Sequence, residues 1–248
     1  MTARSGRYAI YLAPEAESAL GRFVNSVIGY DANSGEDVPQ SSASDLPHGV
    51  WEEIASDPRR YGAHATLKAP FRLAHNCDLE ELKHDLAEFA AGWRAFNLGP
   101  LVVTCITRET GGGFVALAQQ NISRDLSTLA AATVVRFDRF RAPLTAAEIA
   151  RHRPERFTKR QRRNLKDYGY PFILDDFTFH ITLTNVLASP EPITRALADR
   201  FAMEVGAVNF CVAALYLFEQ TTLGERFRVA GRFPLENLPV AAPSNVPK

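Results

Sequence analysis

Cysteine is scarce in this sequence, and its few copies lie far apart. The 248 residues include 3 cysteines, Cys77, Cys105 and Cys211, and no C-x-x-C pair. This pattern excludes a disulfide framework and a zinc site built on cysteine, and it is typical of proteins in a reducing cytoplasm. Cys105 and Cys211 lie in apolar runs, so we expect both of them in the core.

Net charge and long apolar runs are also lacking. Lys+Arg and Asp+Glu number 28 each, so a general electrostatic attraction to nucleic acid or to a membrane surface is not expected. No stretch approaches the roughly 18 apolar residues of a membrane span, and the N-terminal MTARSGRYAIYLAP has no signal-peptide core. We therefore expect a cytoplasmic protein with no membrane partner.

Metal-binding motifs are absent as well. The sequence contains no H-E-x-x-H, no Cys/His cluster and no Asp-rich motif. We expect no metal and no cofactor, so any chemistry is assigned to ordinary side chains.

The sequence does contain alternating strand-like and helix-like segments, which are typical of an α+β protein. Residues 7–14 predict a strand, residues 20–29 a helix, and residues 51–55 a short helix that stops at Pro58. The other expected elements are a helix capped by Asp78, a hairpin around 111–113, a helix over 123–137, a helix over 190–204, paired strands over 208–220 and 226–235, and a loose tail over 239–248.

One segment differs from the rest in charge. Residues 136–163 carry ten Lys/Arg against three acids. Thr145 and Glu148 predict a helix capping box, and Pro154 separates two short helices. We interpret 136–170 as a basic helical insert. It is either a lid that gathers a phosphorylated substrate or an RNA backbone, or simply the solvent-exposed face of a helix.

The tetrapeptide H-x-T-L occurs twice, in YGAHATLKAPFRL (61–73) and in FTFHITLTNVL (177–187). In a strand, residues i and i+2 share a face and lie roughly 6.6 Å apart. His64 and Thr66 therefore point one way from a strand near 62–68, as do His180 and Thr182 from a strand near 178–184. We expect the two strands to face each other across a cleft.

Two histidines and two threonines suit the cleavage of a phosphodiester. A neutral imidazole removes a proton from the attacking water or hydroxyl, and a protonated one donates to the departing oxygen, because the pKa of histidine lies near working pH. The threonine hydroxyls can hold the non-bridging oxygens. Which histidine is the acid, and whether the reaction is hydrolysis or ligation, stay open.

Several neighbouring residues are candidates for substrate binding, each with a structural alternative. Lys68 follows Thr66 on the same expected face, although it also suits a strand leaving the core for solvent. Thr184 holds the corresponding position after Thr182, or it satisfies a neighbouring strand. The tyrosine candidates are Tyr8 and Tyr11 on the first strand, which line the cleft or pack in the core, and Tyr168 and Tyr170 in a turn before the second motif.

The paired motifs resemble the two-histidine (2H) phosphoesterase superfamily, which includes LigT-like RNA ligases and cyclic-nucleotide phosphodiesterases. Together with RYAIYLAP, they resemble a subgroup encoded with bacterial phosphonate-utilisation genes, over essentially the whole chain. The resemblance implies a single domain over 1–248 with a bilobal LigT-like α+β fold. In that fold two antiparallel sheets from two pseudo-symmetric lobes form a central cleft, with helices packed outside.

The resemblance also implies a function. We expect a metal-independent hydrolase of a cyclic phosphodiester in phosphonate metabolism, with a small partner such as a cyclic ribose phosphate or nucleotide. One alternative is an RNA-end 2',3'-cyclic phosphodiesterase or ligase, which the neutral charge and the lack of an aromatic-basic stripe disfavour. Another is a nucleotide- or phosphate-binding protein without catalysis.

Overall fold

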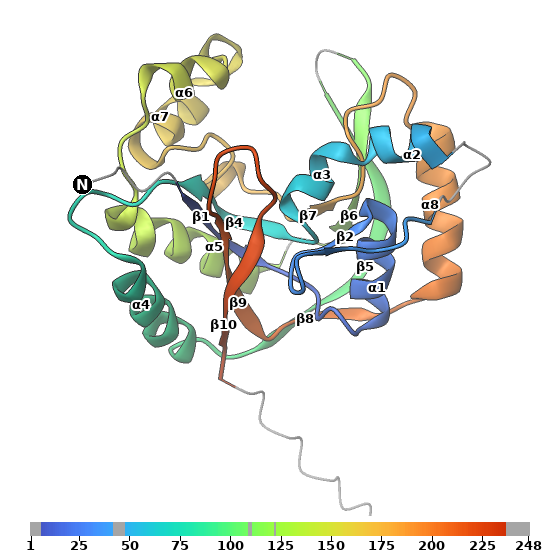
Figure 1. The fold of residues 1–248 in the computed structure, drawn as a ribbon, viewed down its shortest axis with the longest axis horizontal. Helices are drawn as coiled ribbons and strands as arrows, with labels where there is room; N and C mark the ends of the chain where they lie inside the picture. The colour runs from blue at the N-terminus through green and yellow to red at the C-terminus, as the bar shows by residue number, and fades with distance from the viewer. Residues whose placement is uncertain (1–5, 42–47, 109–110, 122, 237–248) are drawn as a thin grey trace, which may run out of the picture.

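The computed structural model describes residues 6–41, 48–108, 111–121 and 123–236. Within them, two four-stranded antiparallel sheets occupy the centre and helices lie outside (Figure 1). The predicted α+β class with two antiparallel sheets is confirmed. The tail expected over 239–248 lies outside the described residues. No helix of the described part is long and apolar enough to cross a membrane.

The helices and strands have the following bounds in chain order: β1 Arg7–Leu12, α1 Ala19–Ile28, β2 Tyr30–Asp31, β3 Glu36–Asp37, α2 His48–Ile54, α3 Ser56–Tyr61, β4 Ala65–Phe71, α4 Leu79–Ala91, β5 Phe96–Thr107, β6 Gly113–Gln119, α5 Arg124–Phe137, η1 Asp138–Phe140, α6 Ala146–Arg151, η2 Pro154–Arg156, α7 Lys159–Tyr168, η3 Leu174–Asp176, β7 His180–Thr182, α8 Glu191–Glu204, β8 Asn209–Val212, β9 Ala214–Gln220 and β10 Arg228–Pro234.

The two sheets exchange strands between the two halves of the chain. The first sheet has the order β10-β9-β1-β4 and the second β7-β6-β5-β8. β4, which carries Thr66 of the first histidine motif, is thus an edge strand, as is β7 of the second motif. The hairpin β5–β6 follows β4 in the chain but pairs with β7, while β9 and β10 follow β7 but join β1 and β4. Neither sheet is therefore built from one half of the chain alone.

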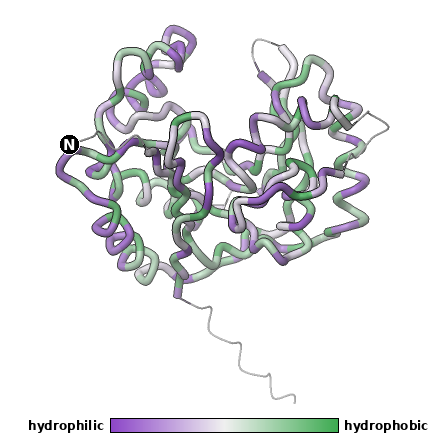
Figure 2. Tube along the Cα trace, viewed as in Figure 1, coloured by the Kyte–Doolittle hydropathy of each residue, from purple (hydrophilic) through white to green (hydrophobic). Residues whose placement is uncertain are grey.

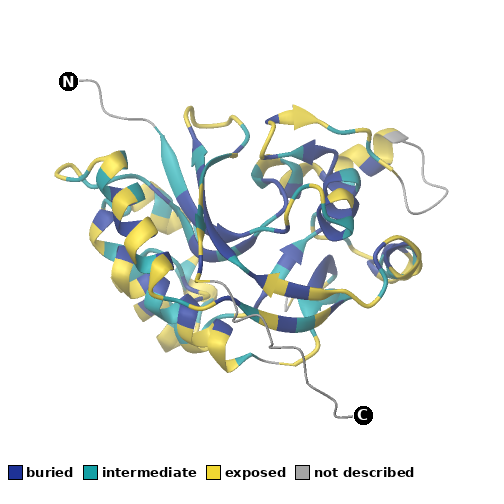
Figure 3. Ribbon diagram, turned by 90° about the horizontal axis from the view of Figure 1, so that it is seen from below, coloured by how far each residue is buried: buried dark blue, intermediate teal, exposed yellow. Residues whose placement is uncertain are grey.

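Local side chains determine where the main helices begin and end. Asp78 accepts a hydrogen bond from the Glu81 amide, so the predicted cap of α4 is confirmed, and Ser18 caps α1 in the same way. α1 ends at Gly29, whose φ of 74° is a left-handed conformation that suits glycine. α4 and α5 pack on the first sheet and α8 on the second. Of the strands, β1, β6 and β9 are largely buried (Figure 3), whereas β10 is half-buried or exposed along its length.

The short helix expected over 51–55 is confirmed as α2, which ends at Ile54. The sequence does not predict the helix that follows, α3, which holds Pro58 in its first turn, where no amide donor is needed. Two other predictions about this framework are wrong in part. The predicted pairing of 208–220 with 226–235 is confirmed for β9 and β10, but residues 208–220 form two strands rather than one, with β8 in the second sheet and β9 in the first. Cys211 is exposed and Cys105 is only half-buried; Cys211 lies on the outer face of β8.

The basic segment folds into two short helices, α6 and α7, on either side of Pro154, as the sequence predicts. They stand apart from the sheets at the upper left of Figure 1 and are largely hydrophilic (Figure 2). Thr145 and Glu148 form the predicted capping box at α6. At the start of the segment, the cation of Arg136 pairs with Asp85 on α4 at 2.8 Å, so part of the charge run is already neutralised.

Candidate active site

The two His-x-Thr motifs occupy equivalent edges of the two sheets. His64 directly precedes β4, and His180 opens β7. β4 and β7 contact each other, and a positive charge on His180 would lower the pKa of His64, so the two imidazoles are electrostatic neighbours. The side chains that alternate with the motif residues are buried, as expected: Ala65, Leu67, Ile181 and Leu183.

The two histidine rings are held by the same backbone contact. Nδ1 of His64 lies 2.9 Å from the carbonyl oxygen of Gly62, and Nδ1 of His180 lies 2.9 Å from the carbonyl oxygen of Thr178. A carbonyl only accepts, so each Nδ1 carries the proton and donates it. Nε2 of each neutral ring is then left with a lone pair for the substrate.

His64 lies among aromatic rings. Its ring centroid is 4.0 Å from that of Tyr11, in a stacked arrangement, and 5.8 Å from that of Tyr61. Burial therefore lowers the pKa of His64 from 6.5 to about 4, against the opposing effect of the Gly62 carbonyl. At neutral pH this imidazole is uncharged and able to accept a proton.

His180 lies in a cavity of about 260 Å³, which we name the histidine cavity. Burial lowers the pKa of His180, and the positive charge of Arg108 lowers it further. The ring of Phe114 is 5.6 Å away, with the Arg108 guanidinium 5.3 Å from that ring. The residues that line the histidine cavity are Thr66, Ile106, Thr107, Arg108, Phe114, Tyr170, Phe172, Asp176, Phe177, Thr178 and His180.

Sequence reasoning missed two cations near the motifs. Arg108 follows β5 at the mouth of the histidine cavity, and Arg7 opens β1. Arg7 and Tyr11 are four residues apart on one strand, so they share the face that carries His64. Neither arginine belongs to a motif. Only the tertiary fold brings them to the site.

Asn185 connects the two motif regions through side-chain hydrogen bonds. Its side chain accepts a hydrogen bond from the Asp57 amide at 2.8 Å and donates to the Glu53 carbonyl oxygen and to Ser56 Oγ. These partners form the junction of α2 and α3, which leads into the first motif. The loop after β7 is therefore anchored to the segment before His64.

Lys68 does not share the face of Thr66, contrary to the sequence prediction. The pairing of β4 with β1 shifts register between Tyr11 and Ile10, so Thr66 pairs with Tyr11 but Lys68 with Ile10. This bulge turns Lys68 into the core, where its ammonium lies 3.0 Å from Asp138. Burial lowers the pKa of Lys68 to about 8, although Asp138 opposes that effect.

Thr184 is likewise engaged inside the protein. β7 ends at Thr182, and the Thr184 hydroxyl accepts a hydrogen bond from the Val115 amide and donates to the Asn185 carbonyl. It is 1% exposed. Thr184 therefore fits the structural alternative, in which its hydroxyl forms a hydrogen bond with the backbone of a neighbouring strand.

The tyrosine candidates separate into three groups. Tyr11, rather than Tyr8, packs on His64, because residues three apart on a regular strand point to opposite faces. Tyr170 lines the histidine cavity. Tyr168 is the last residue of α7 and is not among the residues that line this cavity.

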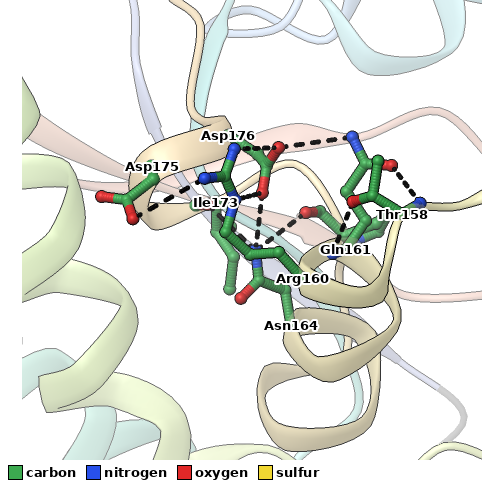
Figure 4. A network of polar contacts seen from close by, with 8 residues as sticks. Thr158, Arg160, Gln161, Asn164, Ile173, Asp175 and Asp176 are labelled. Carbon is green, nitrogen blue, oxygen red and sulfur yellow. Dashed lines mark hydrogen bonds and ion pairs between the residues drawn. The ribbon is translucent and has the colours of Figure 1, made fainter.

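Figure 4 shows a network of polar contacts around Asp176, which is one of the residues that line the histidine cavity. Asp176 of η3 receives two hydrogen bonds from Arg160 of α7, at 2.7 and 2.9 Å. The side-chain nitrogen Nδ2 of Asn164 donates to the carbonyl oxygens of Pro171 and Ile173 and to the carboxylate of Asp176. The insert is therefore bonded to the segment that leads into β7. Within the described residues, no three His, Cys, Asp or Glu side chains are grouped so as to hold a metal ion.

Comparison with known proteins gives one family and two curated relatives. A family model described as "Protein of unknown function (DUF1045)" matches residues 66–228. The protein named "Ribose 1,5-bisphosphate phosphokinase PhnN" of Janthinobacterium sp. (strain Marseille) is 33% identical over 233 residues, and the one of the same name of Laribacter hongkongensis (strain HLHK9) is 30% identical over 227 residues. These matches cover 92% and 90% of this chain but 50% of each relative, so the chain spans about half the length of the curated relatives it matches.

The comparison with solved structures gives two matches that cover most of the chain. One is described as "Crystal structure of phosphoesterase", with 14% identity and a TM-score of 0.40, over 94% of this chain and 99% of that one. The other is described as "Crystal structure of E.coli LigT complexed with 3'-AMP", with 15% identity and a TM-score of 0.40, over 94% and 99% of the two chains.

Proposed function

This chain belongs to the family described as "Protein of unknown function (DUF1045)", and from that premise we propose that it is a phosphoesterase that hydrolyses a small cyclic phosphodiester. The observation that carries the proposal is the matched pair of imidazoles. Nδ1 of His64 and Nδ1 of His180 each lie 2.9 Å from a backbone carbonyl oxygen, on two strands that contact each other. Each Nε2 is thereby available for proton transfer at one phosphate.

His64 is assigned as the general base. Because burial holds its pKa at about 4, it is neutral at physiological pH. It takes a proton from water as the water oxygen bonds to phosphorus. The P–O bond to one ring oxygen breaks, and that oxygen receives the proton of His180. The product is a ring-opened phosphomonoester, and no metal is needed to balance the step.

His180 is assigned as the general acid, although its pKa is lowered in the free protein. A bound phosphate diester brings a negative charge next to both imidazoles, which favours the protonated form. Thr66 and Thr182 share the faces of the two histidines, and their hydroxyls donate to the non-bridging oxygens.

The substrate class is a phosphorylated ribose. The histidine cavity of about 260 Å³ suits a small molecule, and the two curated relatives are named for ribose 1,5-bisphosphate. The chain contains no G-x-x-x-x-G-K-S/T phosphate-binding loop, so we take from that name the class of substrate and not the kinase reaction. This assignment agrees with the resemblance to proteins encoded with phosphonate-utilisation genes.

The test is a turnover assay on ribose 1,2-cyclic phosphates and 2',3'-cyclic mononucleotides, with EDTA present. Wild type is expected to open the ribose 1,2-cyclic phosphate. His64→Ala and His180→Ala should each lose at least about a hundredfold in kcat, the usual contribution of a general acid or base. His84→Ala is the matched control, because His84 is an exposed histidine on α4. Preference for 2',3'-cyclic nucleotides would indicate RNA-end processing instead. Ligand binding without turnover would leave a binding protein.

A further inference from the structure

A second cavity adjoins the histidine cavity and is lined by arginines. It measures about 230 Å³ and is named here the arginine cavity. Tyr170 lines both cavities, so they meet at this side chain. The lining residues are Arg7, Tyr61, Ala69, Pro70, Phe71, Arg72, Arg141, Ala142, Leu144, Glu148, Arg151, His152, Gly169 and Tyr170, which include four arginines and a single carboxylate.

Two of these arginines already have carboxylate partners. Arg72 lies 3.1 Å from Glu148, and its hydrogen bond to that carboxylate lowers the pKa of Glu148 to about 2, against the opposing effect of burial. Arg141 donates to both oxygens of Asp138, at 2.8 and 3.1 Å. Both guanidinium groups are therefore already bonded to carboxylates of the protein, and they shape the wall of the cavity.

The other two arginines are not neutralised. Nε of Arg7 donates to the side chain of Gln220 at 2.8 Å, and its two terminal nitrogens have no hydrogen-bond acceptor among the residues that the structure describes. Arg151 is exposed at the end of α6. Among the described residues, no carboxylate lies within ion-pair distance of Arg7 or Arg151. The cavity thus holds two unbalanced positive charges, contributed by β1 and by the insert.

The arginine cavity lies close to the proposed reaction centre. Tyr61 lines it, and the Tyr61 ring is 5.8 Å from the ring of His64. Along β4, Thr66 lines the histidine cavity and Ala69 the arginine cavity, a separation of about 10 Å for three strand residues. A pentose with one phosphate at each end spans such a separation.

We propose that the arginine cavity binds a second phosphate group of the substrate through Arg7 and Arg151. The inference rests on the proposed function and makes it more specific: the substrate is a small cyclic phosphodiester that also carries a phosphomonoester. Guanidinium groups bind phosphate oxygens in pairs, as a planar fork, so two of them can hold a dianion.

His152 completes the pocket as a neutral donor. Its ring meets the ring of Tyr170 edge-on, with centroids 6.3 Å apart. Burial lowers the pKa of His152, and the positive charge of Arg151 lowers it further, so it stays uncharged until an anion is bound. Tyr170 would then separate the two phosphates, with the sugar packed against its ring.

The experiment compares two substrates and three variants. The substrates are ribose 1,2-cyclic phosphate with and without a phosphate on O5. The variants are Arg7→Gln, Arg151→Gln and Arg156→Gln, the last an exposed arginine of η2 outside the cavity. Arg7→Gln and Arg151→Gln are expected to lower kcat/KM at least about tenfold further for the O5-phosphorylated substrate than for the unphosphorylated one, since each removes a charge-assisted hydrogen bond to the O5 phosphate. Arg156→Gln should match wild type on both.

A binding measurement separates this proposal from the proposed function. Ribose 5-phosphate, which has no cyclic ester, is titrated calorimetrically into wild type and the same three variants. If wild type cleaves no cyclic substrate but binds ribose 5-phosphate more tightly than Arg7→Gln and Arg151→Gln do, the phosphate cavity stands and the catalytic proposal fails. If both variants bind as wild type does, or lose activity equally on the two substrates, the arginine cavity is not a phosphate site.

Discussion

The phenol ring of Tyr11 stacks on the imidazole of His64, with the two centroids 4.0 Å apart and an angle of 28° between the planes. Burial is the largest cause of the lowered pKa of His64, and this ring supplies part of that burial. Tyr11→Ala should therefore raise the pKa of His64 from about 4 toward 6.5. It should also reduce the free energy of unfolding by about 3–5 kcal/mol, because it opens a cavity in the core.

Histidine NMR titration measures this pKa directly. Tyr11→Phe is the control, since it keeps the ring and should leave the pKa of His64 near its wild-type value. If the pKa of His64 is the same in Tyr11→Ala and in wild type, the stacked ring is not what shields it.

Anion affinity should increase as the pH falls. Both His64 and His180 have lowered pKa values in the free protein, and a bound anion raises them because it stabilises the imidazolium forms. Binding therefore takes up protons. Sulfate, which does not titrate between pH 5 and 8, should bind up to about tenfold more tightly per pH unit for each proton taken up. Calorimetry in buffers of different ionisation enthalpy counts these protons, and His64→Gln should reduce the number. An affinity that does not change with pH contradicts this prediction.

The local part of the site could be predicted from the sequence. Alternation along a strand depends only on residue spacing, so the shared faces of His64 and Thr66, and of His180 and Thr182, follow from the motif itself. The burial of the alternating residues confirms that spacing. The capping box of Thr145 and Glu148 is equally local.

The non-local part could not be predicted in this way. The orientation of Lys68 depends on a bulge, which is set by how β4 pairs with β1, a strand more than fifty residues earlier. The Thr184 hydroxyl is not available to the site because it accepts a hydrogen bond from the Val115 amide of β6. Arg7 and Arg108 reach the cavities only through tertiary packing, and nothing in their sequence neighbourhoods indicates a role.

The stability of the folded protein should fall between pH 6.5 and pH 4. In that range the unfolded chain protonates His64 while the folded protein does not, so acid favours unfolding. The full difference corresponds to about 3 kcal/mol for this residue. His64→Gln should remove that loss, which urea denaturation at pH 7 and pH 4.5 can measure. A pH dependence equal to that of wild type would show that His64 titrates alike in both states.

Lys68 and Asp138 should have unequal effects on stability. Asp138→Asn removes the partner of both Lys68 and Arg141, and breaking a buried pair in this way costs about 3–5 kcal/mol. Lys68→Met leaves Asp138 paired with Arg141 and keeps an apolar stem in the core, so its cost should be below about 2 kcal/mol. Urea denaturation compares the two variants.

The Lys68→Met variant also tests whether Lys68 lies in the core rather than at the substrate site. Folded Lys68→Met should bind sulfate as tightly as wild type, since its ammonium lies in the core beside Asp138. A tenfold loss of sulfate affinity in Lys68→Met would show that the ammonium of Lys68 contributes to anion binding at the site.

The side chain of Asn164 should hold residues 170–176, which form one wall of the histidine cavity, in a single conformation. Its amide nitrogen is bonded to the carbonyl oxygens of Pro171 and Ile173 and to Asp176, and the residue is 4% exposed (Figure 4). Asn164→Leu removes the side-chain donor of the Pro171 carbonyl oxygen and one of the donors of the Ile173 carbonyl oxygen and of Asp176, at a cost of about 1–3 kcal/mol. Because Tyr170 lies in the same segment, kcat/KM should fall further than global stability alone explains.

Hydrogen exchange measures this local effect. Amides of residues 170–178 should exchange faster in Asn164→Leu than in wild type, while those of β9 in the core of the first sheet should not change. Arg160→Gln is the matched control, because it removes an exposed guanidinium from Asp176 and leaves the three Asn164 bonds in place. Asp176 keeps its bonds from Gln161 and Asn164 in this variant, so Arg160→Gln should accelerate exchange much less than Asn164→Leu does. Equal acceleration in both variants would mean that the Arg160 pair, and not the Asn164 amide, holds the wall against which the substrate packs.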